Sequence, residues 1–494
     1  MELNKEYTKF SWQVGYVVAA NIIGLLLGFI QLPILTKGLG ANLYGTWSLV
    51  NVTISLTTPF ALLGLSMAII RFLAAEKDKS RIREDFLSAF SAVFISGTAF
   101  SLFLFFFSDY LAASVFKDIN SSIYIKLASV LILLRAMLGL NLAFLRAFRK
   151  IGFFTTMGLI QSVFEIGLMA LFIFLGYNLM GVITAAIVTG ILLNLITLIP
   201  ILRQIGFQLP RFSHLRAYLK FSIPLTPNST LAWIIALSDR YIIGYFIGAA
   251  AAGIYNAAYS IGNYASFLLI PIGIVLYPTV AKLYDEKKLN ETRNYLSYTV
   301  KYLMMISIPA AFGLSILAKP LLQILATPEF VPGATVVPFV ALGAVISTLY
   351  QISEYIILLV KKTWLLTMLL SISAALNIIL NVILVPRMGI LGAAVATLIV
   401  YGILGILTLI VTRRYLKFDI SMPFMLKSAF SSAIMLLCIW SIHPESIVSV
   451  IISIFAGILI YFGILLLLKG LSREEITFFK NFLKDSLSKI RVIK

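Results

Sequence analysis

Apolar segments of about 20 residues recur along almost the whole chain, separated by short polar gaps. That length is what a helix needs to cross the hydrocarbon core of a bilayer. Of the 494 residues, 60% are hydrophobic and 12% are charged, which leaves more apolar surface than the core of a soluble domain buries. The sequence therefore predicts an all-α integral membrane protein with fourteen transmembrane helices, near residues 11–35, 43–70, 86–107, 123–146, 151–175, 179–201, 218–246, 254–281, 294–317, 335–358, 363–385, 390–411, 423–442 and 446–468.

The distribution of lysine and arginine predicts the orientation of these helices. The net charge is +19, but the basic residues lie in the gaps between apolar segments and form no polar domain, which argues against nucleic-acid binding. Alternate gaps place 31 of the 39 basic residues on the side of the N-terminus and five on the other side. Short loops rich in lysine and arginine stay in the cytoplasm. We expect a multi-pass protein of the cell (inner or plasma) membrane, with both termini cytoplasmic.

An internal repeat predicts two lobes. The segment 180–186 (MGVITAA) reappears as 388–394 (MGILGAA), and Leu43-Tyr44 corresponds to Ile254-Tyr255. Because six helices separate the copies, the repeats are parallel, and helices 13 and 14 lie outside the duplication. Pro59 and Pro271 predict a kink in each half. The expected organisation is an N-terminal lobe (1–202), a cytoplasmic linker (203–217), a C-terminal lobe (218–416), helices 13 and 14 (417–470) and an amphipathic cytoplasmic tail (471–494).

Other segments and residue counts exclude several features. Residues 11–35 are too long and too polar for the apolar part of a signal peptide, so we expect an uncleaved first helix. The chain has one cysteine, Cys438, and two distant histidines, His214 and His443. These residues offer no disulfide framework and no His/Cys metal site, so we expect no metal and no cofactor. In the tail, Ser472 to Glu475 match a capping box that starts a helix.

Two ionisable residues are predicted near the middle of the membrane. Arg135 lies about twelve residues into the helix 123–146, and Glu165 lies at a similar depth in the next helix. A charge at the bilayer centre costs at least about 2.5 kcal/mol, so each residue marks a candidate functional site. Either the two form a structural ion pair, or they face a cavity in which Arg135 binds pyrophosphate.

Three further acidic or basic residues invite two interpretations each. Asp239 and Arg240 form either an ion pair at the interface of the lobes or a contact to a bound headgroup or gate. Glu354 either binds a proton or sodium ion, or extends toward Lys361 at the membrane surface. Glu354, Glu165 and Asp239 are therefore the candidates for binding a coupling ion.

Basic and amide residues mark possible entry and lining positions. Arg146 and Arg149 follow Arg135 at helical spacing, so they either form a cytoplasmic entry track or simply reflect the positive charge of inner loops. Asn21 and Gln31 share one face of the first helix, and Asn256 and Asn263 share one face of the eighth. Such faces either line a wet cavity between the lobes or make contacts between packed helices.

Several motifs resemble one known family. They are Pro33-Ile-Leu-Thr-Lys-Gly-Leu-Gly40 with Tyr44-Gly45, the segment 145–150 (LRAFRK), and 239–246 (DRYIIGYF) with Gly253-Ile-Tyr255. With the layout of six, six and two helices, the chain is similar to the polysaccharide transporters, or O-antigen flippases. Their superfamily also holds multidrug-and-toxin extrusion proteins and peptidoglycan lipid flippases. Lys37 departs from the arginine that the family often has at this position.

The resemblance implies a fold and a function. It implies a V-shaped pair of lobes that alternates between inward and outward openings around a cationic cavity for a polyprenyl-diphosphate-linked glycan. The expected function is a flippase that carries this oligosaccharide lipid to the outer leaflet for surface polysaccharide biosynthesis, with no enzyme activity. The implied partners are membrane lipids, the glycan lipid and polysaccharide-assembly enzymes, without nucleic acid.

Other functions remain as alternatives. A multidrug/cation antiporter of the same superfamily would prefer acidic residues in its cavity. A membrane-integral polysaccharide polymerase or ligase would need a sizeable external loop, and the longest outer gaps, 108–122 and 318–334, are short for that role. A structural scaffold of an export complex would need no polar cavity.

Overall fold

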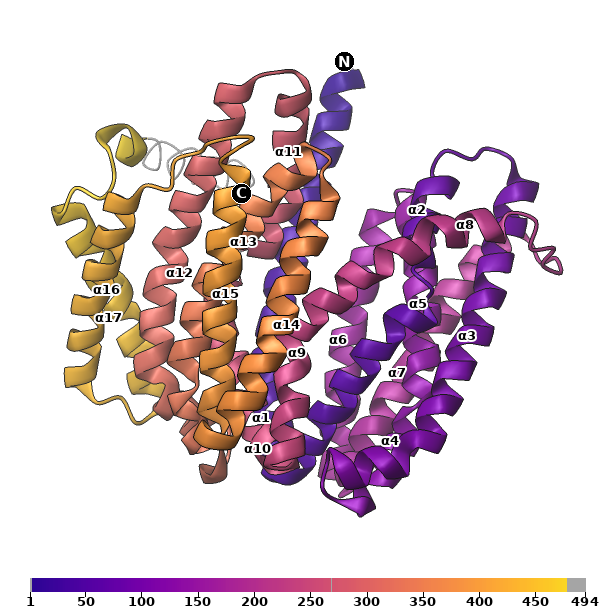
Figure 1. Ribbon diagram of the computed structural model, residues 1–494, viewed down its shortest axis with the longest axis horizontal. Coiled ribbons are helices and arrows are strands. Elements are labelled where there is room, and N and C mark those ends of the chain that lie inside the picture. Colours follow the sequence, from indigo (N-terminus) through magenta and orange to yellow (C-terminus); the bar gives the residue numbers. More distant parts are fainter. Residues whose placement is uncertain (1, 268, 478–494) are drawn as a thin grey trace, which may run out of the picture.

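The computed structural model describes residues 2–267 and 269–477, and within these residues the chain is helical and contains no strand. Figure 1 shows two groups of helices that diverge toward the side on which the N-terminus lies. We call this the N-terminal side and the other the opposite side. The predicted all-α membrane architecture is confirmed.

The first group contains α2 to α8, and α1 crosses from one group to the other (Figure 1). The crossing helix α1 spans Glu2–Ala61. The helices of the first group are α2 (Leu65–Leu73), α3 (Lys79–Ser114), α4 (Ser122–Ala128), α5 (Val130–Ala147), α6 (Ile151–Phe174), α7 (Asn178–Ile205) and α8 (Leu215–Ser222). The second group contains α9 (Thr226–Phe246), α10 (Ala249–Asn263), α11 (Leu269–Asp285), α12 (Leu289–Leu325), α13 (Val337–Leu359), α14 (Thr363–Met388), α15 (Ile390–Thr412), α16 (Met422–Ile442) and α17 (Ile447–Leu467). Short 3-10 turns are η1 (Ile119–Ser121), η2 (Ile223–Leu225), η3 (Tyr264–Ser266) and η4 (Pro328–Thr335).

The predicted count of fourteen transmembrane helices is not confirmed. Among the described residues, eleven helices are long and apolar enough to cross a membrane. The first predicted segment lies in α1 before a break at Gly40 (φ 70°, ψ 174°), and the second runs from the rest of α1 into α2. The two halves of α1 count as one of the eleven. The predicted seventh segment contains α9, and the eighth is divided between α10 and α11; none of these three is among the eleven.

Backbone breaks occur near both prolines that predicted a kink. After Pro59, α1 ends at Ala61, and Leu63 and Gly64 adopt left-handed conformations before α2 begins. In the second half, α10 ends at Asn263, ahead of Pro271 in α11. The breaks allow each helix pair to change direction within the bundle.

The two groups meet at the opposite side through glycines of α1 and α10. A Cβ on Gly45 would lie 1.8 Å from the carbonyl oxygen of Ala249, and one on Gly253 would lie 2.5 Å from that of Ala41. No side chain fits such distances, so the two helix backbones are in direct contact. This contact joins the groups on the side away from their divergence.

Helix α8 ties the start of the second repeat to the first group. The rings of Phe72 and Tyr218 stack with centroids 4.8 Å apart, and the Ser222 hydroxyl donates to the Leu63 carbonyl at 2.7 Å. Asp85 of α3 accepts from the Tyr218 hydroxyl at 2.8 Å. Helix α9 then leads from this anchor into the second group (Figure 1).

The segment after α17 begins with the predicted capping box. The Ser472 hydroxyl accepts from the Glu475 N–H at 3.1 Å, and the Glu475 carboxylate accepts from the Ser472 N–H at 2.8 Å. The same carboxylate binds the Lys301 ammonium of α12 at 2.6 Å. Burial raises the pKa of Glu475, but hydrogen bonds from Lys301 and the Ser472 N–H outweigh it and hold this pKa below its ordinary value. The rest of the predicted tail helix, 478–494, lies outside the described residues.

The glycine contact predicts that replacing glycine by alanine has different effects at two positions. Gly45→Ala forces the α1 and α10 backbones apart, so we expect a loss of about 1–3 kcal/mol of stability, the usual cost of overpacking. Gly463→Ala, in α17, places its methyl group in open space and should be neutral or stabilising by up to about 1 kcal/mol. The thermal unfolding midpoint of the purified protein measures both. Equal midpoints for the two variants would contradict the close packing.

Candidate substrate cavity

Two neighbouring cavities lie between the helix groups. The first has a volume of about 800 Å³ and is lined by helices of both groups, including α1, α6, α9, α13 and α15. The second has a volume of about 490 Å³. Residues 17–25 of α1 line the first cavity and residues 28–35 line the second. Because α1 begins on the N-terminal side, the first cavity is nearer that side and the second lies deeper.

The first cavity is lined by amides, hydroxyls and apolar side chains. Asn21 and Asn263 both line it, as do Tyr259 and Tyr401. Asn21 Nδ2 donates to the Val17 carbonyl of its own helix at 2.8 Å, which leaves its oxygen available. None of its lining residues is Asp, Glu, Lys, Arg or His. This cavity can therefore form hydrogen bonds but supplies no charge.

The second cavity brings together four predicted site residues: Arg135, Glu165, Gln31 and Asn256. Arg135 Nη2 donates to Asn51 Oδ1 at 2.9 Å. In the described part of the chain no ion pair within 4 Å joins Arg135 to Glu165 or to another carboxylate, so the structural ion pair considered above is not formed. Both residues face the same space as separate charges.

The residues that sequence reasoning missed come mainly from α1 beyond its break. Trp47, Asn51 and Ser55 line the second cavity at spacings of four residues, and Ser48 lies beside them. They form one helical face with polar groups inside an apolar segment. This pattern could have identified them from the sequence, because the same pattern in the first helix identified Asn21 and Gln31.

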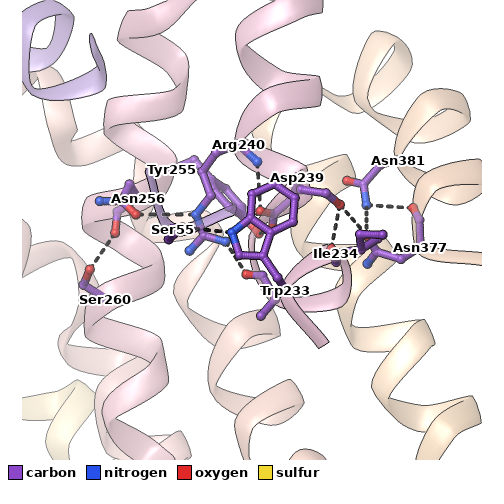
Figure 2. Close-up of polar contacts among 12 residues, drawn as sticks. Ser55, Trp233, Ile234, Asp239, Arg240, Tyr255, Asn256, Ser260, Asn377 and Asn381 are labelled. Carbon is purple, nitrogen blue, oxygen red and sulfur yellow. Dashed lines mark hydrogen bonds and ion pairs between the residues drawn. The ribbon is translucent and has the colours of Figure 1, made fainter. Parts of the chain in front are cut away.

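Asp239 and Arg240 lie in a buried network and line neither cavity. Arg240 is 1% exposed and Asp239 is 0% exposed. Arg240 Nη1 donates to Asp239 Oδ1 at 2.6 Å, and the Tyr255 hydroxyl donates to the other carboxylate oxygen (Figure 2). The Arg240 guanidinium also lies 3.9 Å from the centre of the Tyr259 ring. The two residues therefore form an ion pair, and their partners lie in α9 and α10 of the second group.

The network continues to both neighbouring helices. Asn256 Nδ2 donates to the Tyr44 hydroxyl of α1 at 3.0 Å, which links the two groups. On the other side of α9, the Ser238 hydroxyl donates to Asn377 Oδ1 of α14 at 3.1 Å. Asn377 and Asn381 of α14 are labelled in Figure 2. Side-chain hydrogen bonds therefore connect α9 to α10 and α14, and α10 to α1.

The charge of the cavity lining differs from the cationic cavity that the family resemblance implied. The second cavity carries one cation, Arg135, and one anion, Glu165. Arg240, the other expected cation, is compensated by Asp239. Two or more unpaired cations so close together would repel each other strongly in a low-dielectric interior, whereas the observed set is balanced.

The remaining predicted residues lie at the edge of the cavities or away from them. Glu354 of α13 is hydrogen-bonded to Tyr350 and lines neither cavity. Arg146 is exposed near the N-terminal side and its guanidinium lies 5.3 Å from the ring of Phe154, a residue of the first cavity. Arg149 lies beyond the end of α5 with φ 55°, so the expected helical track of three arginines is interrupted.

An apolar groove adjoins the first cavity. Its volume is about 580 Å³, and it lies between α12, α16 and α17 on one side and α1 with η3 on the other. Leu25, Tyr264 and Phe267 line both the groove and the first cavity. Polar and apolar spaces are thus continuous within the membrane-spanning region.

Removing one member of the buried pair should be costly. Arg240→Leu leaves the Asp239 carboxylate uncompensated, and losses of about 3–5 kcal/mol are usual in such cases. We expect a lower unfolding midpoint and less folded protein in the membrane. Arg387→Leu removes an exposed arginine at the end of α14 and serves as the control, with little expected change. An unchanged midpoint for Arg240→Leu would contradict a structural role for the pair.

Comparisons with known proteins agree with this architecture. The model of the family described as polysaccharide biosynthesis protein matches residues 12–284, and the MatE model matches residues 224–383. The probable low-salt glycan biosynthesis flippase Agl15 of Haloferax volcanii is 25% identical over 94% of this chain and 97% of its own length.

Among solved structures, the lipid II flippase MurJ has a TM-score of 0.78 at 17% identity, covering 91% of this chain and 97% of that one. An inward-facing multidrug resistance MATE transporter has a TM-score of 0.69 at 14% identity, covering 81% and 97%. The chain belongs to the polysaccharide biosynthesis protein family.

Proposed function

We propose that this protein is a flippase that moves a polyprenyl-diphosphate-linked oligosaccharide from the cytoplasmic to the outer leaflet for surface polysaccharide biosynthesis. The observation that carries the proposal is a polar, two-part cavity that adjoins an apolar groove inside the membrane-spanning region. A lipid with a large hydroxyl-rich headgroup needs both surfaces. Each unpaired polar group costs several kcal/mol in hydrocarbon, so the headgroup needs a polar path and the tail does not.

Different residues suit the sugar headgroup and the polyprenyl tail of such a substrate. The amides of Asn21, Asn263, Gln31 and Asn256 line the cavities and match the donors and acceptors of sugar hydroxyls. The groove matches a polyprenyl chain, and its shared boundary at Leu25 and neighbouring residues lets one lipid occupy both spaces. Transport then needs binding and conformational change, without a covalent step.

The proposed orientation places the N-terminal side in the cytoplasm, as the basic loops predict. The first cavity then lies toward the cytoplasm, with the exposed Arg146 near its edge as part of the entry. Enzymes that assemble the oligosaccharide on its lipid carrier would supply the substrate on that side. The likeness of the fold to MurJ and MATE transporters supports an alternating-access cycle in the cell membrane.

A hydrogen-bonded seal on the outer side supports the same cycle. Glu329 of η4 accepts from the Ala41 N–H at 2.9 Å, next to the break at Gly40. The Thr36 hydroxyl donates to the Leu325 carbonyl at 2.9 Å. Both bonds join α1 to the end of α12 or the turn after it, so an outward opening of the cavity has to break them.

Among the acids, Glu165 best fits a coupling-ion site. It lines the second cavity, where a proton or cation has access, and it lies beside Arg135. The carboxylate oxygens of Asp239 accept hydrogen bonds from Arg240 and Tyr255, and Glu354 is bonded to Tyr350. Glu165 is also hydrogen-bonded, to Gln161, but Asp239 and Glu354 line neither cavity, so a proton or ion in the cavity reaches Glu165 and not these two acids.

Export of cationic drugs is the second candidate function. The match of the MatE model to residues 224–383 favours it. A cation site requires a net negative lining, whereas Glu165 is balanced by Arg135 in the second cavity. The balanced lining supports the glycan lipid as the better candidate.

Reconstitution separates the two functions. We expect liposomes that contain the purified protein to move a fluorescent polyprenyl-diphosphate disaccharide between leaflets, measured as loss of protection from a reagent that does not cross the membrane. Empty liposomes provide the control. Transport of ethidium under an ion gradient without movement of the lipid would reject the flippase and favour drug export.

The seal makes a further prediction about Glu329. Glu329→Ala removes the side-chain acceptor of the Ala41 N–H, a net loss of about 0.5–1.5 kcal/mol for the closed outer side. Glu329→Gln keeps an acceptor oxygen and is the matched control. In a Cys438→Ser background, which removes the one native cysteine, Ser260→Cys reports access to the second cavity. An impermeant maleimide added outside cells should label it faster in Glu329→Ala; equal labelling rates would contradict the seal.

A further inference from the structure

We propose that the second cavity binds sugar hydroxyls of the headgroup and that the diphosphate binds elsewhere. This inference rests on the proposed function and adds to it by assigning one part of the substrate to one part of the cavity. It begins from the two charged side chains in the lining, Arg135 and Glu165.

Arg135 has unused hydrogen-bonding capacity in this cavity. A guanidinium carries five N–H donors, and among the described residues Arg135 makes one hydrogen bond, to Asn51 Oδ1 at 2.9 Å. Glu165 lines the same cavity, is hydrogen-bonded to Gln161 and acts on Arg135 through its charge. Both side chains line the cavity of about 490 Å³, and no ion pair within 4 Å joins them in the described structure, so a ligand in this cavity can contact both.

The chemistry of the two side chains selects what this group is. It must accept hydrogen bonds from the Arg135 guanidinium and donate to the Glu165 carboxylate. Neighbouring hydroxyls of a sugar ring do both. A diphosphate only accepts, and its negative charge would lie beside a carboxylate in a low-dielectric site, which is unfavourable. The pair therefore fits a sugar better than a pyrophosphate.

The other residues that line the second cavity also supply groups that bind sugars. The Ser48 hydroxyl is buried, lines the cavity and has no hydrogen-bond partner among the described residues. Gln31, Asn256 and Ser260 add amide and hydroxyl groups, and Trp47 adds an aromatic ring. A site built to hydrogen-bond hydroxyls rejects ligands that lack them, because its own buried polar groups then stay unpaired. The second cavity thus selects the substrate by hydrogen bonding to its sugar hydroxyls.

Two lipid probes test this assignment on the purified full-length protein. One is geranylgeranyl diphosphate, and the other is the same lipid diphosphate carrying a neutral disaccharide. We expect Arg135→Gln to weaken binding of the disaccharide lipid about ten- to a hundredfold, as expected for lost hydrogen bonds to a charged group. Glu165→Gln, which keeps an acceptor without the charge, should weaken it about five- to tenfold. Neither variant should change binding of the lipid without sugar.

The same substitutions at exposed positions provide controls. Arg387→Gln and Glu291→Gln lie at the ends of α14 and α12, outside both cavities, and should bind both lipids like the unchanged protein. Tighter binding of geranylgeranyl diphosphate by Glu165→Gln, with weaker binding by Arg135→Gln, would overturn the inference and assign the diphosphate to Arg135. Binding of neither lipid by the folded, unchanged protein would instead reject the proposed function itself.

Discussion

The bilayer provides no counter-charge, and this constraint organises the polar groups of the structure. Lys301 forms an ion pair with Glu475. Arg240 forms an ion pair with Asp239, which also accepts a hydrogen bond from Tyr255, and its guanidinium lies over the Tyr259 ring. Both arrangements compensate the charge within the protein. Arg135 and Glu165 differ, because they face one cavity without forming an ion pair. The way in which each charge is compensated thus separates the residues that hold the bundle together from those available to a substrate.

The sequence was sufficient to predict features that depend on composition and helical periodicity. It did not predict features that depend on contacts with side chains of neighbouring helices. The helical architecture and the polar residues Asn21, Gln31, Asn256 and Asn263 of the cavity lining follow from apolar runs and helical faces. The helix count did not follow: the predicted gap between the first two segments does contain the break at Gly40, but the two halves of α1 count as one of the eleven apolar helices. The predicted seventh and eighth segments correspond to the helices α9, α10 and α11, which are not among the eleven. The environment of Arg240 also depends on side chains of α10, and no spacing within α9 reveals them.

The internal repeat explains where the two groups meet. Tyr44 and Tyr255 occupy corresponding places in the repeats, and both lie where α1 and α10 are in contact. Their hydroxyls have diverged: Tyr44 accepts from Asn256, whereas Tyr255 donates to Asp239. One contact surface is therefore built from two copies of the same segment.

A balanced cavity also suits a carrier that must release its substrate. Hydrogen bonds to sugar hydroxyls replace bonds to water, so the net gain per bond is only about 0.5–1.5 kcal/mol. A lining of several unpaired cations would hold a diphosphate far more tightly, and release would then require that the attraction be overcome in each cycle. In the observed cavity Glu165 offsets Arg135 electrostatically, which limits the attraction for an anion and leaves hydrogen bonding to discriminate between headgroups. Selectivity then depends on the arrangement of donors and acceptors, and it is compatible with fast exchange between the two sides of the membrane.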